Sequence, residues 1–494
     1  MIGLTVGEIA AVVGAELSTG HADALVTSVV ADSRTVEPGA LFVALGGARV
    51  DGHDHVLPAT QAGAVAAVTS RDVPPATCLV VDDPLAALGR VARRVVDRGV
   101  AGGLQVVGIT GSQGKTSTKD LLAQVLEAAG PTVAPVGNLN NELGVPLTAC
   151  RLEPSTRFLV AELGARGVGH IAYLCGIVAP RIGVVLNVGQ AHVGEFGGQQ
   201  AIARAKGELV EALPATGHAV LNADDPLVWA MRERTGANVL AFSGSGSGSD
   251  SQALDGPAVW VSQVTADRLG RHAFVLHHRD GSGAVDAAEV GLRVTGRHQV
   301  PNAAAAAAAA LALGLELDAV AAALSAAGPR SRWRMELHQR PDGVVVVNDS
   351  YNANPDSMRA AVGTLVELGS GSNGRTIAVV GDMLELGDSA AAEHAGLGRH
   401  LAAVRVDRVL ALGEYAPTVV EAAVAAGLDP ERAHAVSGKE QAIALLRAEL
   451  RPGDVVLVKA SRGLALDTVA EALIAPDAVL DPAETPSATR EEPA

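Results

Sequence analysis

The chain has 494 residues, of which 48% are hydrophobic and only 2% aromatic, and it carries a formal net charge of −16. This length exceeds one ordinary hydrophobic core and predicts about three domains, with cores built from Ala, Val and Leu. The excess of 54 acidic over 38 basic residues, without a basic stripe, argues against nucleic acid as a partner.

Cysteine usage and the first residues indicate the compartment. Cys78, Cys150 and Cys175 are odd in number, widely spaced and close to apolar residues, so we expect buried, reduced thiols rather than disulfides or a metal site. Residues 1–14 include the acidic Glu8 and lack a basic segment, so no signal peptide is predicted. We therefore expect a cytoplasmic protein, and we expect it to be a monomer.

Residues 1–102 alternate short apolar strands with helices, which predicts a small α/β domain. Two polar segments interrupt this pattern. One is Asp32-Ser33-Arg34, and the other runs from residue 46 to residue 53.

Residues 108–116, Gly-Ile-Thr-Gly-Ser-Gln-Gly-Lys-Thr, form the most informative stretch. They follow an apolar run, residues 104–109, and precede a helical pattern over residues 119–129. Glycines let consecutive N–H groups point at one anion, and the helix N-terminus adds a positive dipole. Lys115 supplies a charge, and the Thr116 hydroxyl can reach Mg²⁺. The glycine spacing differs from the commonest Walker form; an ordinary Gly-rich turn is the alternative to the predicted nucleoside triphosphate site.

The central section, residues 103–329, alternates strands and helices over longer distances. Residues 157–162, 182–187 and 218–222 are typical of buried strands, so we expect a central parallel sheet. The alanine-rich run at residues 303–315 is too short to span a bilayer. We expect it to be a helix packed closely against the sheet, and we expect no membrane contact.

Three further central residues have chemically useful positions. Glu162 ends one predicted strand and His192 follows another, where a parallel sheet presents ligands, and with Thr116 they could form a Mg²⁺ site. A solvated loop glutamate and a hydrogen-bonding loop histidine are the alternatives. Lys206 lies on a helical pattern, where an ordinary surface lysine is the alternative.

The third section, residues 330–474, again alternates strands and helices and predicts a Rossmann-like, doubly wound domain. Each predicted strand except the last precedes a helical pattern. The strands are residues 344–347, 376–380, 408–412 and 454–458. Residues 475–494 are rich in Pro, Asp, Glu, Ser and Thr and are predicted to be a disordered tail.

Several motifs together resemble those of the Mur ligase family, over residues 25–465. They are the phosphate loop, residues 137–146, residues 222–225, residues 296–298 with Asn302, residues 348–355 and residues 381–387. The last two are most similar to the branch that joins D-alanyl-D-alanine to UDP-N-acetylmuramoyl-tripeptide. The Asp-Asn-Pro-Arg signature of the diaminopimelate-adding branch is absent.

The resemblance implies an ADP-forming peptide ligase of peptidoglycan synthesis that uses ATP and Mg²⁺. ATP would phosphorylate the terminal carboxylate of the tripeptide, because a carboxylate is a poor electrophile, and the amine of D-alanyl-D-alanine would then attack. An α-amino pKa near 8 leaves roughly a tenth of the amine neutral at pH 7, so positioning and charge neutralisation are the main demands. Either lysine or diaminopimelate at the end of the tripeptide is compatible with the sequence.

The resemblance also implies roles for individual residues. Implied catalytic residues are Lys115, Glu162, His192, Lys206 and Arg334. Implied ATP contacts are Thr110, Gly111, Ser112, Gln113, Gly114, Lys115, Thr116, Ser117, Asn302, Arg334, Asp349 and Asn354. Implied metal ligands are Thr116, Glu162, His192 and, if it is carbamylated, Lys206. Implied substrate contacts are Ser33, Arg34, Asn138, Asn141, Tyr351, Lys459 and Arg462.

Some of these roles have structural alternatives. Ser33 and Arg34, with residues 46–53, would contact the uridine nucleotide, or they form a tight turn with a surface arginine. Lys459 and Arg462 would bind the acidic end of D-alanyl-D-alanine, or they are simply exposed.

Two rival functions share part of this sequence pattern. A folylpolyglutamate synthase shares the central domain but normally lacks a uridine-binding first domain. A nucleotide switch of the GTPase type should carry an Asn-Lys-x-Asp motif, which is absent. Because the implied contacts come from three domains, we expect an open form without ligands and a closed form with them.

Overall fold

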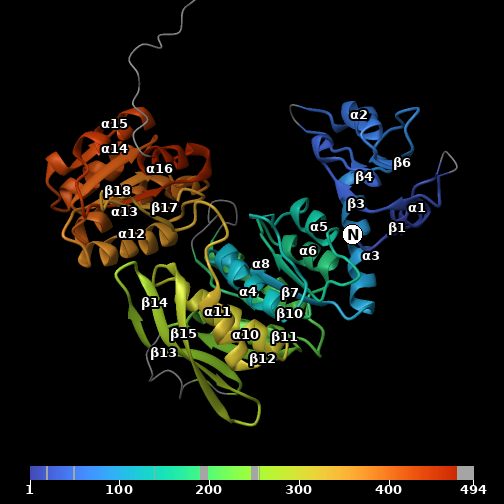
Figure 1. Cartoon of the computed structure of the whole chain (residues 1–494), viewed down its shortest axis with the longest axis horizontal. Helices are drawn as coiled ribbons and strands as arrows, with labels where there is room; N and C mark the ends of the chain where they lie inside the picture. Colours follow the sequence, from blue (N-terminus) through green and yellow to red (C-terminus); the bar gives the residue numbers. More distant parts are fainter. Residues whose placement is uncertain are drawn as a thin grey trace, which may run out of the picture.

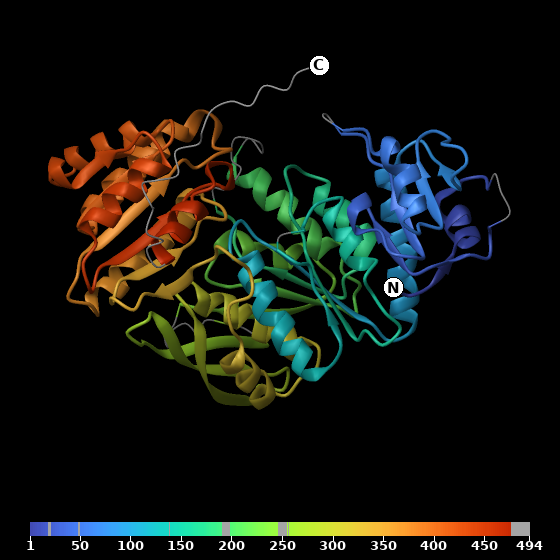
Figure 2. The same ribbon diagram turned by 45° about the horizontal axis from the view of Figure 1, so that its top comes forward.

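The computed structural model describes residues 1–17, 21–47, 50–137, 139–189, 198–245, 254 and 256–475. Three α/β bodies follow one another in chain order, and the central one lies between the other two (Figure 1, Figure 2). Each body is built on its own main sheet, so the predicted fold class is confirmed.

The first body contains a two-stranded antiparallel pair and a four-stranded parallel sheet in the order β3-β4-β5-β6. Its strands are β1 (Leu4–Thr5), β2 (Leu25–Val26), β3 (Ser28–Val30), β4 (Ala40–Val43), β5 (Ala66–Thr69) and β6 (Cys78–Val80). Its helices are α1 (Val6–Val13), α2 (Val56–Gln61) and α3 (Pro84–Ala101).

Helix α3 joins the first body to the central one. It begins sharply because the Asp83 carboxylate accepts the N–H groups of Leu85 and Ala86, and because Pro84 fits the first helical position. Its buried apolar side chains belong to a core cluster that continues into one face of the central sheet. The two bodies therefore share one hydrophobic core.

The central body is a nine-stranded sheet in the order β15-β14-β13-β12-β11-β10-β7-β9-β8. Its strands are β7 (Gln105–Thr110), β8 (Thr132–Val133), β9 (Phe158–Glu162), β10 (Ile182–Val185), β11 (His218–Asn222), β12 (Asn238–Ser243), β13 (Ala258–Ala266), β14 (Arg271–Arg279) and β15 (Val285–Thr295). Its helices are α4 (Lys115–Ala129), α5 (Gly144–Ala149), α6 (His170–Val178), α8 (Gln199–Glu211), α9 (Pro226–Trp229), α10 (Gln299–Ala312) and α11 (Leu317–Ala326).

The predicted parallel sheet is confirmed from β8 to β13, where every neighbouring pair is parallel. The sequence interpretation did not include the long antiparallel ribbon formed by β14 and β15 at one edge. In β14 buried residues alternate with more exposed ones, as expected for an antiparallel strand with one face open to solvent.

The alanine-rich segment is helix α10, as predicted. All eight residues from Ala303 to Ala310 have no exposed surface. The helix packs against α4 and against strands β10 to β13. Small side chains allow this close approach to two neighbours at once.

The third body has a six-stranded sheet in the order β16-β17-β21-β18-β19-β20, parallel except for β16. Its strands are β16 (Glu336–Gln339), β17 (Val345–Asn348), β18 (Thr376–Gly381), β19 (Arg408–Leu412), β20 (Ala433–Ala435) and β21 (Val455–Lys459). Its helices are α12 (Pro355–Ser370), α13 (Ala390–Ala403), α14 (Ala416–Ala425), α15 (Lys439–Glu449) and α16 (Asp467–Ile474).

The four predicted strands are confirmed, and buried clusters lie on both faces of the sheet. The prediction that no helix follows the last of them is wrong. Helix α16 comes soon after β21, and its residues Val469, Ala470 and Leu473 are buried. Most of the predicted tail, residues 476–494, lies outside the described residues.

Cys78, Cys150 and Cys175 are buried free thiols, which confirms their predicted burial. Among the described residues, no helix combines the length and hydropathy needed to cross a bilayer.

Candidate functional site

The phosphate loop joins β7 to α4 at the carboxyl edge of the central sheet. Helix α4 begins at Lys115, four residues earlier than the predicted pattern, and no side chain caps its N-terminus. Its first N–H groups are therefore available to an anion. Gly114 has φ +80°, and a Cβ there would lie 2.5 Å from Oδ1 of Asn302. This position therefore requires glycine.

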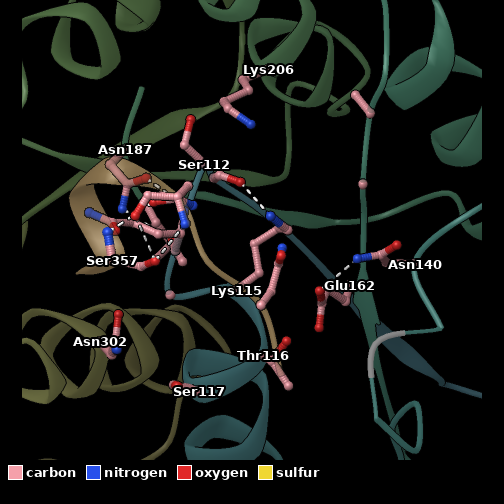
Figure 3. A pocket seen from close by; sticks show the side chains of 18 of the residues that line it. Ser112, Lys115, Thr116, Ser117, Asn140, Glu162, Asn187, Lys206, Asn302 and Ser357 are labelled. Carbon is pink, nitrogen blue, oxygen red and sulfur yellow. Dashed lines mark hydrogen bonds between the residues drawn. The ribbon is translucent and has the colours of Figure 1, made fainter. Parts of the chain in front are cut away.

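Asn187, at the end of β10, braces the phosphate loop (Figure 3). Its Oδ1 accepts the Gln113 N–H at 3.0 Å, and its Nδ2 donates to the Gln113 carbonyl at 3.1 Å. Its own carbonyl accepts the Ser112 N–H, and the Ser112 hydroxyl accepts the N–H of Gly189. No function was predicted for Asn187, although an amide at the end of a strand next to β7 was a usable signal.

The half-buried Lys115 points its ammonium group at the phosphate loop, where Nζ donates to the Gly111 carbonyl at 2.7 Å. Burial lowers the pKa of Lys115, Arg334 lowers it further, and Glu162 opposes the shift. A phosphate bound in the loop would offer this ammonium group a stronger, charge-assisted acceptor than the carbonyl.

One carboxylate oxygen of Glu162, near the phosphate loop, is available to bind a ligand. The side chain of Glu162 is buried, Oε1 accepts a hydrogen bond from Nδ2 of Asn140 at 2.8 Å, and Oε2 has no hydrogen-bond partner among the described residues (Figure 3). The buried Thr116 lies at the start of α4. The oxygen donors fit Mg²⁺, which is commonly bound by one or two carboxylates together with substrate phosphates.

No group of three His, Cys, Asp or Glu side chains suited to a metal occurs among the described residues. The third predicted protein ligand, His192, lies outside the described residues.

Lys206, on α8, is a buried lysine, so the surface-lysine alternative is wrong. Its side chain makes no hydrogen bond or ion pair with a described residue. Burial, with additional repulsion from Lys115, lowers its pKa well below the ordinary value. A buried amine of this kind favours its neutral, nucleophilic form.

One cavity of about 1720 Å³ connects these groups and is bounded by all three bodies. The first body contributes Asp83, Leu85 and Ala86. Predicted site residues that line the cavity are Gly111, Ser112, Gln113, Gly114, Lys115, Thr116, Ser117, Asn141, Glu162, Lys206, Asn302, Arg334, Asp349, Tyr351, Asn354 and Lys459.

Three family models match consecutive parts of the chain. The model described as "Mur ligase family, catalytic domain" matches residues 25–94, the "Mur ligase middle domain" matches residues 109–310, and the "Mur ligase, glutamate ligase domain" matches residues 333–462. The chain belongs to the Mur ligase family.

Individual relatives match this Mur ligase over nearly its whole length. The UDP-N-acetylmuramoyl-tripeptide–D-alanyl-D-alanine ligase of Mycobacterium leprae is 44% identical, covering 97% of this chain and 100% of the relative. The Escherichia coli protein of the same name is 36% identical, with 96% and 99% covered. A crystal structure of MurF from Acinetobacter baumannii has a TM-score of 0.84 at 31% identity, with 96% and 99% covered.

The third body of this Mur ligase holds its cavity residues in a tight cluster. The Arg334 guanidinium lies 4.3 Å from the ring centre of Tyr351. Lys459 is only 2% exposed, and its Nζ contacts Asp349 Oδ2 and the Asn352 carbonyl, each at 2.7 Å. Simple exposure is therefore the wrong interpretation for Lys459.

Several predicted ligand contacts also have structural roles. Asn354 caps α12 by accepting the Ser357 N–H at 2.9 Å, and Asn141 accepts the Gly144 N–H at 2.8 Å. Asn302 donates to the side chain of Gln299 at 3.0 Å.

Four predicted contacts do not line the cavity. Thr110 is buried, and its hydroxyl donates to the Leu163 carbonyl at 2.9 Å. Arg462 pairs with Asp467 and stacks on Trp333. The other two are Ser33 and Arg34.

Ser33 and Arg34 lie in a short turn whose preceding residue, Asp32, pairs with the guanidinium. The Arg34 side chain is 87% exposed, as in the tight-turn alternative. The uridine-nucleotide contact at these residues stays a prediction. Asn138 lies outside the described residues.

Proposed function

We propose that this chain is an ATP-dependent, ADP-forming ligase that joins D-alanyl-D-alanine to UDP-N-acetylmuramoyl-tripeptide. The product would be the pentapeptide precursor of peptidoglycan, which gives the enzyme a role in cell wall biogenesis, cell shape and cell division. The names of the curated relatives support this activity, since they match nearly end to end. The proposal includes a cytoplasmic, monomeric enzyme.

One observation carries the proposal. The phosphate loop, the uncommitted oxygen of Glu162 and the buried Lys206 border the same cavity as residues of the first and third bodies. A nucleotide switch would need only the nucleotide half of this cavity. The remaining volume suits two further substrates that meet beside the γ-phosphate of ATP.

The chemistry follows from the groups that line the cavity. The terminal carboxylate of the tripeptide attacks the γ-phosphorus, which gives an acyl phosphate and ADP. The amine of D-alanyl-D-alanine then attacks the carbonyl carbon, phosphate leaves with the bridging oxygen, and the amine loses a proton. Lys115 and Arg334 neutralise charge on the transferred phosphoryl group, and the braced loop holds it in line.

Thr116 and Glu162, with His192, would hold Mg²⁺ beside the nucleotide. When bound, the ion neutralises charge on the β- and γ-phosphate oxygens. The hydrogen bond from Asn140 to Oε1 orients the Glu162 carboxylate, so that Oε2 stays available to the metal. Asn302 and Asn354 would contact the nucleotide from the opposite side of the cavity, together with Asp349.

Lys206 is proposed to carry a carbamate, formed when its neutral amine adds carbon dioxide and releases a proton. The product is an anion, which removes repulsion between Lys206 and Lys115 and supplies oxygen donors for a metal. Native mass spectrometry in bicarbonate should detect the added carboxyl group in the wild type and not in Lys206→Gln. An unmodified wild-type mass under these conditions would contradict the modification.

An omission assay tests the function. ATP, Mg²⁺, UDP-N-acetylmuramoyl-tripeptide and D-alanyl-D-alanine are supplied together and then with each one left out, and ADP and UDP-pentapeptide are quantified. We expect both products in equal amounts only in the complete mixture, with the lysine and diaminopimelate tripeptides compared in parallel. Steady ADP formation without the peptide substrates would instead support a nucleotide switch.

A further inference from the structure

The cavity is lined by several cationic side chains, and nearly all of them already have partners. Those of Lys115, Arg297, Arg334 and Lys459 contact, respectively, the Gly111 carbonyl, the carbonyls of residues 244 and 245, the Tyr351 ring, and Asp349. Lys206 is buried, and its charged form is disfavoured.

Arg166 differs from all of these. Its side chain lines the same cavity and is exposed to it, and its guanidinium makes no hydrogen bond, ion pair or ring contact with any described residue. A guanidinium keeps its charge at all physiological pH values. Arg166 is therefore a permanent cation at the cavity wall whose guanidinium no described residue contacts.

The loop that carries Arg166 is held at both ends. At its start, the Leu163 N–H donates to the Ile109 carbonyl and the Gly164 N–H donates to the Asn140 carbonyl, both at 2.8 Å. At its end, the carboxylate of Glu208 accepts the N–H groups of Gly169 and Ala172. The backbone that carries Arg166 therefore runs between two anchored points, a few residues beyond Glu162.

An anionic ligand is the natural partner for such a group, and the nucleotide already has its own cradle in the phosphate loop and α4. The neighbouring cavity wall carries the acidic residues Asp83 and Glu142, both close enough to raise the pKa of Tyr173. An entering carboxylate would be repelled there unless a cation compensated it. The planar guanidinium matches a carboxylate with two parallel hydrogen bonds.

We propose that Arg166 binds the terminal carboxylate of the acceptor peptide, the group that becomes phosphorylated. This inference rests on the proposed ligase function. It names the residue that recognises the terminal carboxylate of the tripeptide substrate. Arg166 would hold the carboxylate beside the γ-phosphate and offset the repulsion between the two anions.

Calorimetry with two ligands tests the assignment: UDP-N-acetylmuramoyl-tripeptide and its analogue with a terminal carboxamide. The wild type should bind the carboxylate about ten- to a hundredfold more tightly, the range for one charge-assisted pair. Arg166→Gln should lose the preference for the carboxylate, and Arg166→Lys should retain part of the discrimination. The KM for the tripeptide should rise in Arg166→Gln while the KM for ATP stays unchanged.

Arg181→Gln is the matched control, because Arg181 is an exposed arginine beside the start of β10, at the opposite edge of the sheet. It should retain wild-type discrimination, and all variants should unfold at the wild-type temperature. The inference is overturned if Arg166→Gln keeps the full preference for the carboxylate, or if the wild type binds both ligands equally. The omission assay with the wild type tests the ligase function separately, so the two failures are distinguishable.

Discussion

Asn140 holds the carboxylate of Glu162, the proposed metal ligand, through one side-chain hydrogen bond, so its effect on Mg²⁺ binding can be measured directly. Asn140→Ala frees Oε1 of Glu162 and lets the carboxylate rotate away from the nucleotide. Loss of such an outer-shell partner typically weakens metal affinity about 10- to 100-fold. Titration of Mg²⁺ in the presence of a non-hydrolysable ATP analogue should show this loss.

The matched control is Asn238→Ala, at an exposed asparagine on the amino edge of the sheet. It should leave Mg²⁺ affinity unchanged. Equal Mg²⁺ affinities in Asn140→Ala and the wild type would show that Asn140 does not orient a metal ligand.

His298 predicts a pH dependence of stability. Burial lowers its pKa from 6.5 to about 4, although Asp349 opposes the shift; Lys459 and His272 add to it. Its Nδ1 is also buried, and no described residue forms a hydrogen bond with it. Because the unfolded chain binds this proton more readily, stability should fall as the pH drops from about 6.5 to about 4, by an amount on the order of 3 kcal/mol.

Unfolding temperatures of the wild type and His298→Asn, measured across this pH range, check the prediction. The variant should lose less stability than the wild type as the pH falls. Parallel curves for the two proteins would contradict a neutral His298 in the folded protein.

Individual site residues were predictable where one short sequence motif supplies both the backbone groups and the side chains that bind the ligand. Lys115 and Thr116 stand at fixed offsets in a glycine-rich loop, so their positions followed from spacing. Asn140 and Asn187 act by bracing other groups, and only the fold brings them to Glu162 and to the phosphate loop. The burial of Lys206 could not be read from a helical pattern, because it depends on what packs against the helix.

Helix α10 gives a prediction at the scale of an element. Ala306 is completely buried where α10 crosses the sheet beside α4. Ala306→Leu forces extra atoms into a packed interface and should destabilise the central body by about 1–3 kcal/mol. Thermal unfolding should show a lower transition temperature, whereas Ala322→Leu, at an exposed position in α11, should have little effect. A transition unchanged in Ala306→Leu would mean that the helix is loosely packed.

Buried elements were predicted better than half-exposed ones. Strands β9, β10 and β11 are continuous apolar runs, which only a parallel sheet covered on both faces accommodates. In the ribbon of β14 and β15 buried and more exposed positions alternate, but polar and apolar residues do not alternate regularly. The sequence signal for these edge strands is therefore weaker. Helix α16 is short, and its burial against the third sheet provides most of its stability.

At the scale of the molecule, the cavity between the three bodies predicts closure on binding. ATP analogue and UDP-N-acetylmuramoyl-tripeptide together would bridge surfaces of the first, central and third bodies. Small-angle scattering should therefore give a smaller radius of gyration with both ligands than without them. Identical dimensions in the two states would contradict closure.

The boundaries expected at residues 102 and 329 stay predictions, although each of the three main sheets falls within one expected range. The relative placement of the bodies was not predictable from sequence, because it depends on the shared core around α3 and on contacts across the cavity.

The transfer of oxygen from the tripeptide to phosphate tests the central claim most directly. The tripeptide is labelled with oxygen-18 in its terminal carboxylate and is consumed with ATP and D-alanyl-D-alanine, and the released phosphate is analysed by mass. Activation as an acyl phosphate predicts one labelled oxygen in each phosphate. Unlabelled phosphate, released while the pentapeptide is formed, would contradict the account.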